Sequence, residues 1–120
     1  MSDHRYTTTE RREHLLALEH SVERLLTAIR KTQRYTEYIP KYEHALSRTR
    51  ELLNTGFDQE ALSALARTLP RLFHLHKDWV PPLKIGADGQ YTVPRWFEAL
   101  EPLEQAVAAC GQRLRAVGIY

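Results

Sequence analysis

Apolar residues recur every three to four positions along most of the chain, a pattern typical of helices with one buried face. The first run starts after Thr7, and Thr7 with Glu10 forms the Thr-x-x-Glu pattern of a helix capping box. We expect this helix to reach about Tyr35, because the chain then approaches Pro40. Its apolar face consists of Leu15, Leu18, Val22, Leu25 and Ile29, widened by Leu16 and Leu26.

The second run follows Pro40, a residue that suits the first turn of a helix. Two arrangements are open here: a new helix that begins at Pro40, or one continuous helix that is kinked at it. Gly56 is expected to end the helix in a left-handed conformation, with Phe57 folding back onto the last turn. The apolar face consists of Tyr42, Ala45, Leu46, Thr49, Leu52 and Leu53.

The third run follows Asp58, a favoured helix cap, and contains Pro70, which should bend the helix or split it in two. Its apolar face consists of Ala61, Leu62, Leu65, Leu69, Leu72, Phe73 and His76. The last run contains Pro102, which either kinks this helix or marks the start of its longer part. That run consists of Trp96, Leu100, Leu103, Val107, Cys110, Leu114 and Val117. Together the runs predict an all-α fold, a four-helix antiparallel bundle.

Residues 74–97 interrupt the helical pattern between helices 3 and 4. Pro81 and Pro82 prevent the preceding helix from continuing, while Asp88 and Gly89 favour a tight hairpin turn. Residues 83–85 and 91–93, on either side of that turn, alternate apolar and polar side chains as short strands do. We therefore predict a short β-hairpin-like insertion that is rich in proline and aromatic residues.

The composition narrows the classes of protein to be considered. With 120 residues and 42% hydrophobic content, the chain suits a single helical domain over residues 1–120, of which residues 1–6 are expected to be disordered. Its single cysteine cannot form an internal disulfide, and no apolar run approaches the roughly 20 residues that span a bilayer. The N-terminus also lacks the apolar stretch of a signal peptide. We therefore expect a cytoplasmic protein without membrane contact.

Candidate catalytic and metal-binding groups are sparse. His20 and Glu23 form one possible ligand pair, but no matching pair occurs on the other helices. Cys110 falls on an apolar face, where a thiol fills space rather than reacts. The chain also lacks a nucleophile elbow and a glycine-rich phosphate loop. We expect no enzymatic activity, no metal and no cofactor.

The leading functional prediction concerns the insertion and the helix that follows it. Tryptophan, tyrosine and arginine dominate binding hot spots, and prolines keep such a surface preorganised. This predicts a protein-binding module of the adaptor, chaperone or immunity-protein type, with a homodimer as a possible state. A simpler interpretation is that the aromatic residues close one end of the bundle as a lid. The predicted partner-binding residues are His74, Lys77, Asp78, Trp79, Tyr91, Arg95 and Trp96.

Two alternative functions remain open. Basic residues alternate with tyrosines near the junction of helices 1 and 2, the combination that nucleic-acid sites use, although the net charge of +2 is small. The same residues also suit helix-dipole neutralisation and local packing. The other alternative is a small-molecule or metal site between the helices, lined by His76 and Trp79. The nucleic-acid hypothesis rests on Arg30, Lys31, Arg34, Tyr38 and Lys41.

Overall fold

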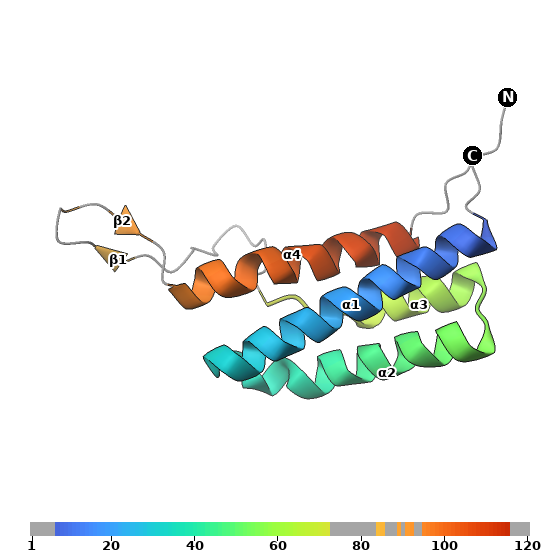
Figure 1. Cartoon of the computed structure of the whole chain (residues 1–120), viewed down its shortest axis with the longest axis horizontal. Coiled ribbons are helices and arrows are strands. Elements are labelled where there is room, and N and C mark those ends of the chain that lie inside the picture. The colour runs from blue at the N-terminus through green and yellow to red at the C-terminus, as the bar shows by residue number, and fades with distance from the viewer. Residues whose placement is uncertain (1–6, 73–83, 86–88, 90, 93–94, 116–120) are drawn as a thin grey trace, which may run out of the picture.

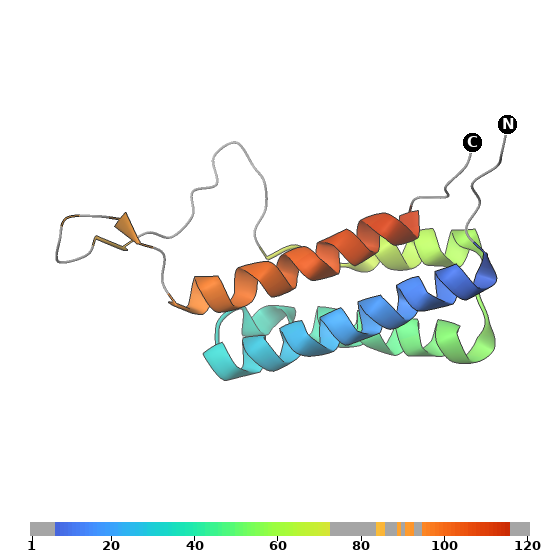
Figure 2. The ribbon, with the colours of Figure 1, turned by 45° about the horizontal axis from the view of Figure 1, so that its top comes forward.

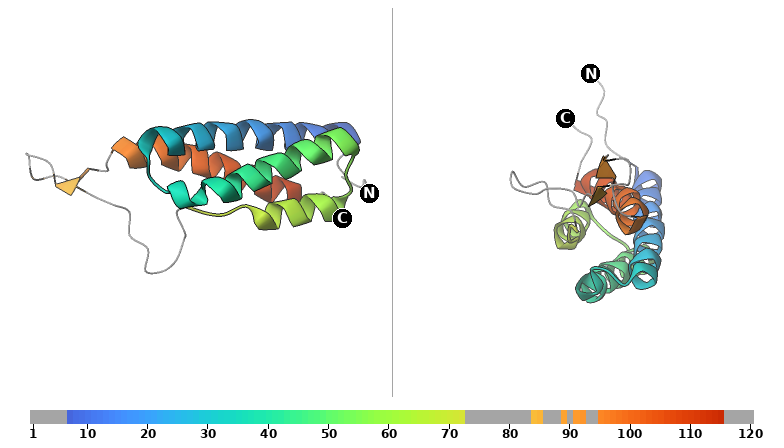
Figure 3. Two further views of the ribbon diagram at one scale, coloured as in Figure 1. Left: turned by 90° about the horizontal axis from the view of Figure 1, so that it is seen from below. Right: turned by 90° about the vertical axis from the view of Figure 1, so that its left-hand side faces the viewer.

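The computed structural model describes residues 7–72, 84–85, 89, 91–92 and 95–115. These residues form four α-helices, α1 (Thr8–Thr32), α2 (Ile39–Thr55), α3 (Gln59–Thr68) and α4 (Arg95–Arg115), and the short 3-10 helix η1 (Thr36–Tyr38). Successive α-helices run in opposite directions, and α1 packs against both α2 and α4 (Figure 1). The short α3 packs against α4 and α2, which closes the ring (Figure 3). The predicted helical fold with four helices is confirmed, and the helices pack as a bundle.

The core is built around α1. All five predicted residues of its apolar face, from Leu15 to Ile29, are fully buried, and Leu26 is buried with them. Leu16 was expected to widen this face, but 45% of it is exposed. At 100° per residue, Leu16 points away from the core that its neighbour Leu15 enters.

The capping box at the start of α1 is confirmed. The Glu10 amide donates to Thr7 Oγ1 at 3.0 Å, and the Thr7 amide donates to Glu10 Oε1 at 2.9 Å. Helix α1 ends earlier than predicted, at Thr32, because Gln33 turns into the left-handed region with φ 57°. The chain then reverses through η1 into α2, so the two helices are separate and not one kinked helix (Figure 2).

Helix α2 ends at Gly56 as predicted, but the conformation of this glycine differs from the expected one. Its φ of 104° is positive, whereas its ψ of 165° is extended and not that of a left-handed helix. Few residues other than glycine adopt this combination. Phe57 is half-buried against the core, and Asp58 caps α3 by accepting from the Ala61 amide at 2.8 Å.

The third helix is shorter than its apolar pattern predicted. It ends at Thr68, and Leu69 is extended with ψ 122°, as the residue before a proline prefers. Pro70 therefore follows the helix and does not bend it. Leu72 is still buried, so the apolar spacing continues into a segment that is not helical. Phe73 and His76 lie outside the described residues.

In α4, Pro102 lies inside a continuous helix. Most of its predicted apolar face is buried, as the residues Leu100, Val107, Cys110 and Leu114 show. Two positions differ, since Phe97 and Glu104 are buried where Trp96 and Leu103 are only half-buried. Gly111 lies where α4 meets the end of α3, and a Cβ there would come within 2.8 Å of a Leu69 methyl group. None of the helices in the described ranges is long and apolar enough to cross a membrane.

Between α3 and α4, two pairs of residues face each other as short strands. Strand β1 (Lys84–Ile85) pairs antiparallel with β2 (Tyr91–Thr92), with Lys84 opposite Thr92. Residues 86–88 and 90, which link the two strands, lie outside the described residues, as do residues 1–6 at the N-terminus. Two residue pairs do not establish the proline- and aromatic-rich hairpin insertion, and it stays a prediction.

Candidate binding surface

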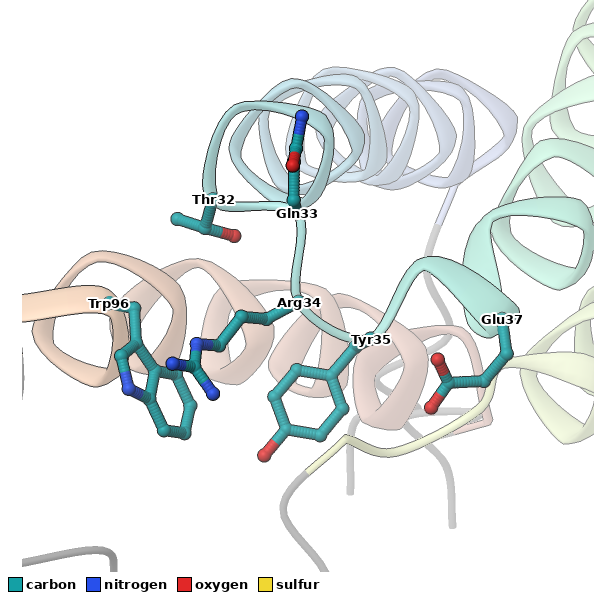
Figure 4. A pocket seen from close by; sticks show the side chains of 6 residues that line it. All are labelled: Thr32, Gln33, Arg34, Tyr35, Glu37 and Trp96. Carbon is teal, nitrogen blue, oxygen red and sulfur yellow. The ribbon is translucent and has the colours of Figure 1, made fainter.

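At one end of the bundle, the turn between α1 and α2 meets the start of α4. Basic and aromatic side chains from the two segments gather there, and we call this set the basic-aromatic surface. Arg34, Tyr35 and Trp96 lie on one side of the turn, while Gln33 points away from them (Figure 4). The surface consists of Arg34, Tyr35, Tyr38, Lys41 and Trp96.

The turn has an unusual backbone. Gln33 and Tyr35 both have left-handed conformations, with φ values of 57° and 63°. Residues other than glycine seldom adopt this conformation, and such strain tends to occur at functional positions. Arg34 lies between the two residues. The backbone reversals therefore carry Arg34 away from the axis of α1 and towards Trp96 of α4.

Ring contacts connect the members of the surface. The Arg34 guanidinium carbon lies 4.5 Å from the centroid of the Trp96 ring, within cation-π range. Tyr35 lies 5.9 Å from Trp96 and 6.3 Å from Tyr38, measured between ring centroids, and both pairs are tilted. The Lys41 ammonium lies 5.4 Å from the centroid of the Tyr38 ring. The result is a chain of rings with a cation at each end.

Trp96 connects the basic-aromatic surface to the core of the bundle. Trp96 makes an edge-to-face contact with the buried Phe97, with their ring centroids 6.0 Å apart. Thr32, Gln33 and Glu37 complete an open hollow of about 480 Å³ beside Trp96. Burial raises the pKa of the Tyr35 phenol above its ordinary value. Aromatic rings that carry a polar group are common on binding surfaces.

The cations between α1 and α2 are held in ion pairs. On the opposite side of α1, Arg30 pairs with Glu43 at 2.7 Å, and Arg50 pairs with Glu19 at 3.0 Å. By contrast, four cations at or beside the basic-aromatic surface have no carboxylate partner among the residues that the structure describes. They are Lys31, Arg34, Lys41 and Arg95.

Only part of the predicted partner-binding set can be placed. Arg95 is exposed in the first turn of α4, and Trp96 is half-buried beside it. Of Tyr91, only the backbone position in β2 is described. The remaining predicted residues, which are His74, Lys77, Asp78 and Trp79, lie outside the described part of the chain. His76, which was predicted to line a ligand site together with Trp79, lies outside it as well.

The residues of the nucleic-acid hypothesis all lie near this end. Lys31, Arg34, Tyr38 and Lys41 belong to or flank the basic-aromatic surface, whereas Arg30 is held by Glu43 on α2. From the sequence, Trp96 was predicted to bind a protein and Arg34 to bind nucleic acid, on two separate surfaces. The structure places the two residues in contact. Antiparallel packing was the available signal, because it places the end of the first helix beside the start of the fourth.

Other polar groups of the described residues serve the fold. They include no cluster of three histidine, cysteine or acidic side chains that could hold a metal. Cys110 is buried, with its sulfur 3.6 Å from Ser21 Oγ. His20, the histidine of the one possible ligand pair, is exposed on α1. The basic-aromatic surface is therefore the strongest candidate for a functional site.

Comparison with known proteins identifies no relative: no family model matches the chain, and no curated protein or solved structure is detectably similar to it.

Proposed function

We propose that this protein is a binding module that holds an acidic segment of another protein on the basic-aromatic surface. The observation that supports this most is the stacking of Arg34 on Trp96, within a group of cations that lack carboxylate partners in the described chain. An adaptor, chaperone or inhibitor of the immunity type would act through such a surface. A homodimer would be compatible with this role.

Arg34 is suited to recognise a carboxylate. Stacking on the indole restricts the guanidinium before a partner arrives, so less conformational entropy is lost on binding. A guanidinium stacked through its face still has its N–H groups at the edge, where they can donate in pairs to a carboxylate. Lys41, beside Tyr38, would supply a second positive charge to the same partner.

A partner protein fits this surface better than a single-stranded nucleic acid. Nucleic-acid sites of that kind use aromatic faces on which bases stack. Here Arg34 covers a face of Trp96, and Lys41 lies over the ring of Tyr38. Bases would have to displace these cations, whereas carboxylates would bind to them directly. The closeness of Lys31, Arg34, Tyr38 and Lys41 keeps nucleic acid as the second candidate.

The segment 74–94, with its predicted hairpin, forms a second part of the proposal. We expect it to extend the binding area with Trp79 and its neighbours, because it precedes Arg95 and Trp96 of α4 directly in the chain. Replacing Trp79 by alanine should then weaken partner binding and leave the helical circular dichroism signal unchanged. An unaltered affinity would remove this segment from the binding area.

Affinity capture from the native cell extract tests the main proposal. The bait would be the intact chain, compared with the charge-reversed variant R34E/K41E and with R48E/R67E, a control with the same change in net charge on α2 and α3. Each capture would be run with and without nuclease. We expect to recover a protein whether or not nuclease is added. Its recovery should be lost with R34E/K41E and unchanged with R48E/R67E.

Two results would overturn the main proposal. Equal loss of the captured protein with both double variants would mean that net charge, and not this surface, determines binding. Captured material that disappears after nuclease treatment and weakens steeply with salt would favour the nucleic-acid function instead.

A further inference from the structure

A groove runs along the seam between α1 and α4 and begins at the basic-aromatic surface. Two alanines form its floor: Ala28, which is half-buried, and Ala99, which is exposed. Leu103, also half-buried, continues this floor along α4. Because alanine side chains are short, the backbone of an added element could approach both helices closely.

Cations flank this apolar floor. Arg24 and Lys31 lie along α1, and Arg34 and Arg95 lie at the end that leads into the basic-aromatic surface. None of the four has a carboxylate partner within the described ranges. Glu23 also lines the groove, but its carboxylate is paired with Arg50 at 3.3 Å. An apolar strip with positive edges complements a partner with an apolar strip and negative edges.

Ion pairs join α1 to α2, and one joins the segment that follows α3 to α4. Arg30 and Arg50 bridge the seam between α1 and α2 through Glu43 and Glu19. Arg71, which follows α3, pairs with Glu104 of α4 at 2.8 Å. No ion pair crosses the seam between α1 and α4 in the described chain. This seam therefore leaves both apolar and charged groups for a partner.

The dimensions of the groove suit a helix. Its α1 wall extends from His20 to Thr32, a rise of about 18 Å at 1.5 Å per residue. That length accommodates about three turns of a second helix. Helices that lie in grooves present apolar residues at positions i, i+3 or i+4, and i+7.

We propose that this groove binds an amphipathic helix of a partner protein, with its apolar face on Ala28, Ala99 and Leu103 and with aspartate or glutamate along its edges. The acidic residues at one end of that helix reach Lys31, Arg34 and Arg95. This inference rests on the proposed function and specifies the form of the acidic segment. It adds residues 20–32 of α1 and 95–103 of α4 to the binding surface.

A library of displayed 16-residue peptides, selected on the intact chain, tests the inference without knowledge of the natural partner. We expect the enriched peptides to combine apolar residues at helical spacing with aspartate or glutamate. Synthetic copies would then be titrated against Ala99→Phe, which fills the groove, and against Ala109→Phe as a matched control at another exposed alanine of α4. Ala99→Phe should weaken binding at least about tenfold, as loss of a central contact does, and Ala109→Phe by less than about twofold.

The outcomes separate this inference from the function on which it rests. The same peptides would be titrated against R34E/K41E. Peptides that bind this variant weakly but are indifferent to Ala99→Phe would overturn the groove and leave the basic-aromatic surface as the binding site. Peptides that depend on neither residue would overturn both. Enriched peptides with a two-residue apolar period would indicate an added strand, and they would contradict the helix, as would a selection that enriches nothing.

Discussion

Glu104 carries a carboxylate that is almost fully buried in α4, with 1% of the residue exposed. Its oxygens accept hydrogen bonds from Arg71 Nε at 2.8 Å, from Arg71 Nη2 at 3.2 Å and from the Leu72 amide at 2.9 Å. A buried charge is tolerated when it is paired and hydrogen-bonded in this way. Through these bonds Glu104 holds the non-helical segment that follows α3, where the predicted third helix would have continued.

Removing this carboxylate should destabilise the fold. Glu104→Ala leaves the Leu72 amide and Arg71 without their acceptor, and we expect the free energy of unfolding to fall by about 2–4 kcal/mol. Urea denaturation measures the loss. The exposed Glu98 serves as the control, since Glu98→Ala should change stability by less than about 0.5 kcal/mol. Similar values for the two variants would contradict the structural role of Glu104.

Tyr42 should make the free energy of unfolding depend on pH. Its hydroxyl donates to the Pro70 carbonyl at 3.0 Å, and burial raises its pKa above the ordinary value of 10.0, with the charge of Glu104 acting in the same direction. Because the folded state holds this proton more tightly, the stabilisation is complete below about pH 10 and is lost as the pH rises further.

The variant Tyr42→Phe isolates this effect. At pH 7 it should be about 1 kcal/mol less stable than the unmodified chain, because it lacks the hydrogen bond to Pro70. Above pH 10 the unmodified chain should lose stability relative to the variant by about 1.4 kcal/mol per pH unit. Urea denaturation of both proteins at pH 7 and pH 11 measures the difference. An equal difference at the two pH values would contradict this account.

Sequence patterns found the apolar core residues more readily than the buried charges. Arg11 continues the buried face of α1, four residues before Leu15, but its charge hid that position. Its guanidinium donates to the carbonyls of Arg113 and Leu114 at 2.9 and 3.0 Å, where α4 ends. Glu104 was likewise absent from the predicted buried face of α4. Pairing across a fold cannot be deduced from periodicity along one helix.

At the level of elements, Pro102 is the most unusual feature of α4. A proline in a helix interior removes one backbone hydrogen bond and crowds the preceding turn. We expect Pro102→Ala to raise the free energy of unfolding by about 1–3 kcal/mol. Pro40→Ala is the control, because the first-turn amide of α2 has no partner within the helix and little should change. A loss of stability with Pro102→Ala would show that the proline ring contributes to packing.

The elements were predictable where caps and apolar spacing agreed. Thr7 with Glu10 located the start of α1, and Gly56 with Asp58 located the boundary between α2 and α3. The third helix was predicted to be longer than it is, because apolar residues continue at helical spacing beyond Pro70. Spacing records which residues face the core, and an extended segment such as the one ending at Leu72 can meet the same condition.

At the level of the whole molecule, the candidate site arises from packing. The end of α1 and the start of α4 are about 60 residues apart in the chain, yet Arg34 and Trp96 are in contact. Both residues were predicted as site residues from their side-chain chemistry, Arg34 in the nucleic-acid hypothesis and Trp96 in the protein-binding one. Only the antiparallel arrangement combines them, so local patterns could not have predicted the composite surface.

The proposed partner binds at the end of the bundle where α1 and α4 meet. Backbone amide chemical shifts of the isotope-labelled chain, followed while the captured partner is added, locate its binding site. We predict that the largest changes fall on residues 31–38 and 95–99, with little change on residues 50–67 of α2 and α3. Changes concentrated on residues 50–67, with residues 31–38 unaffected, would contradict the account.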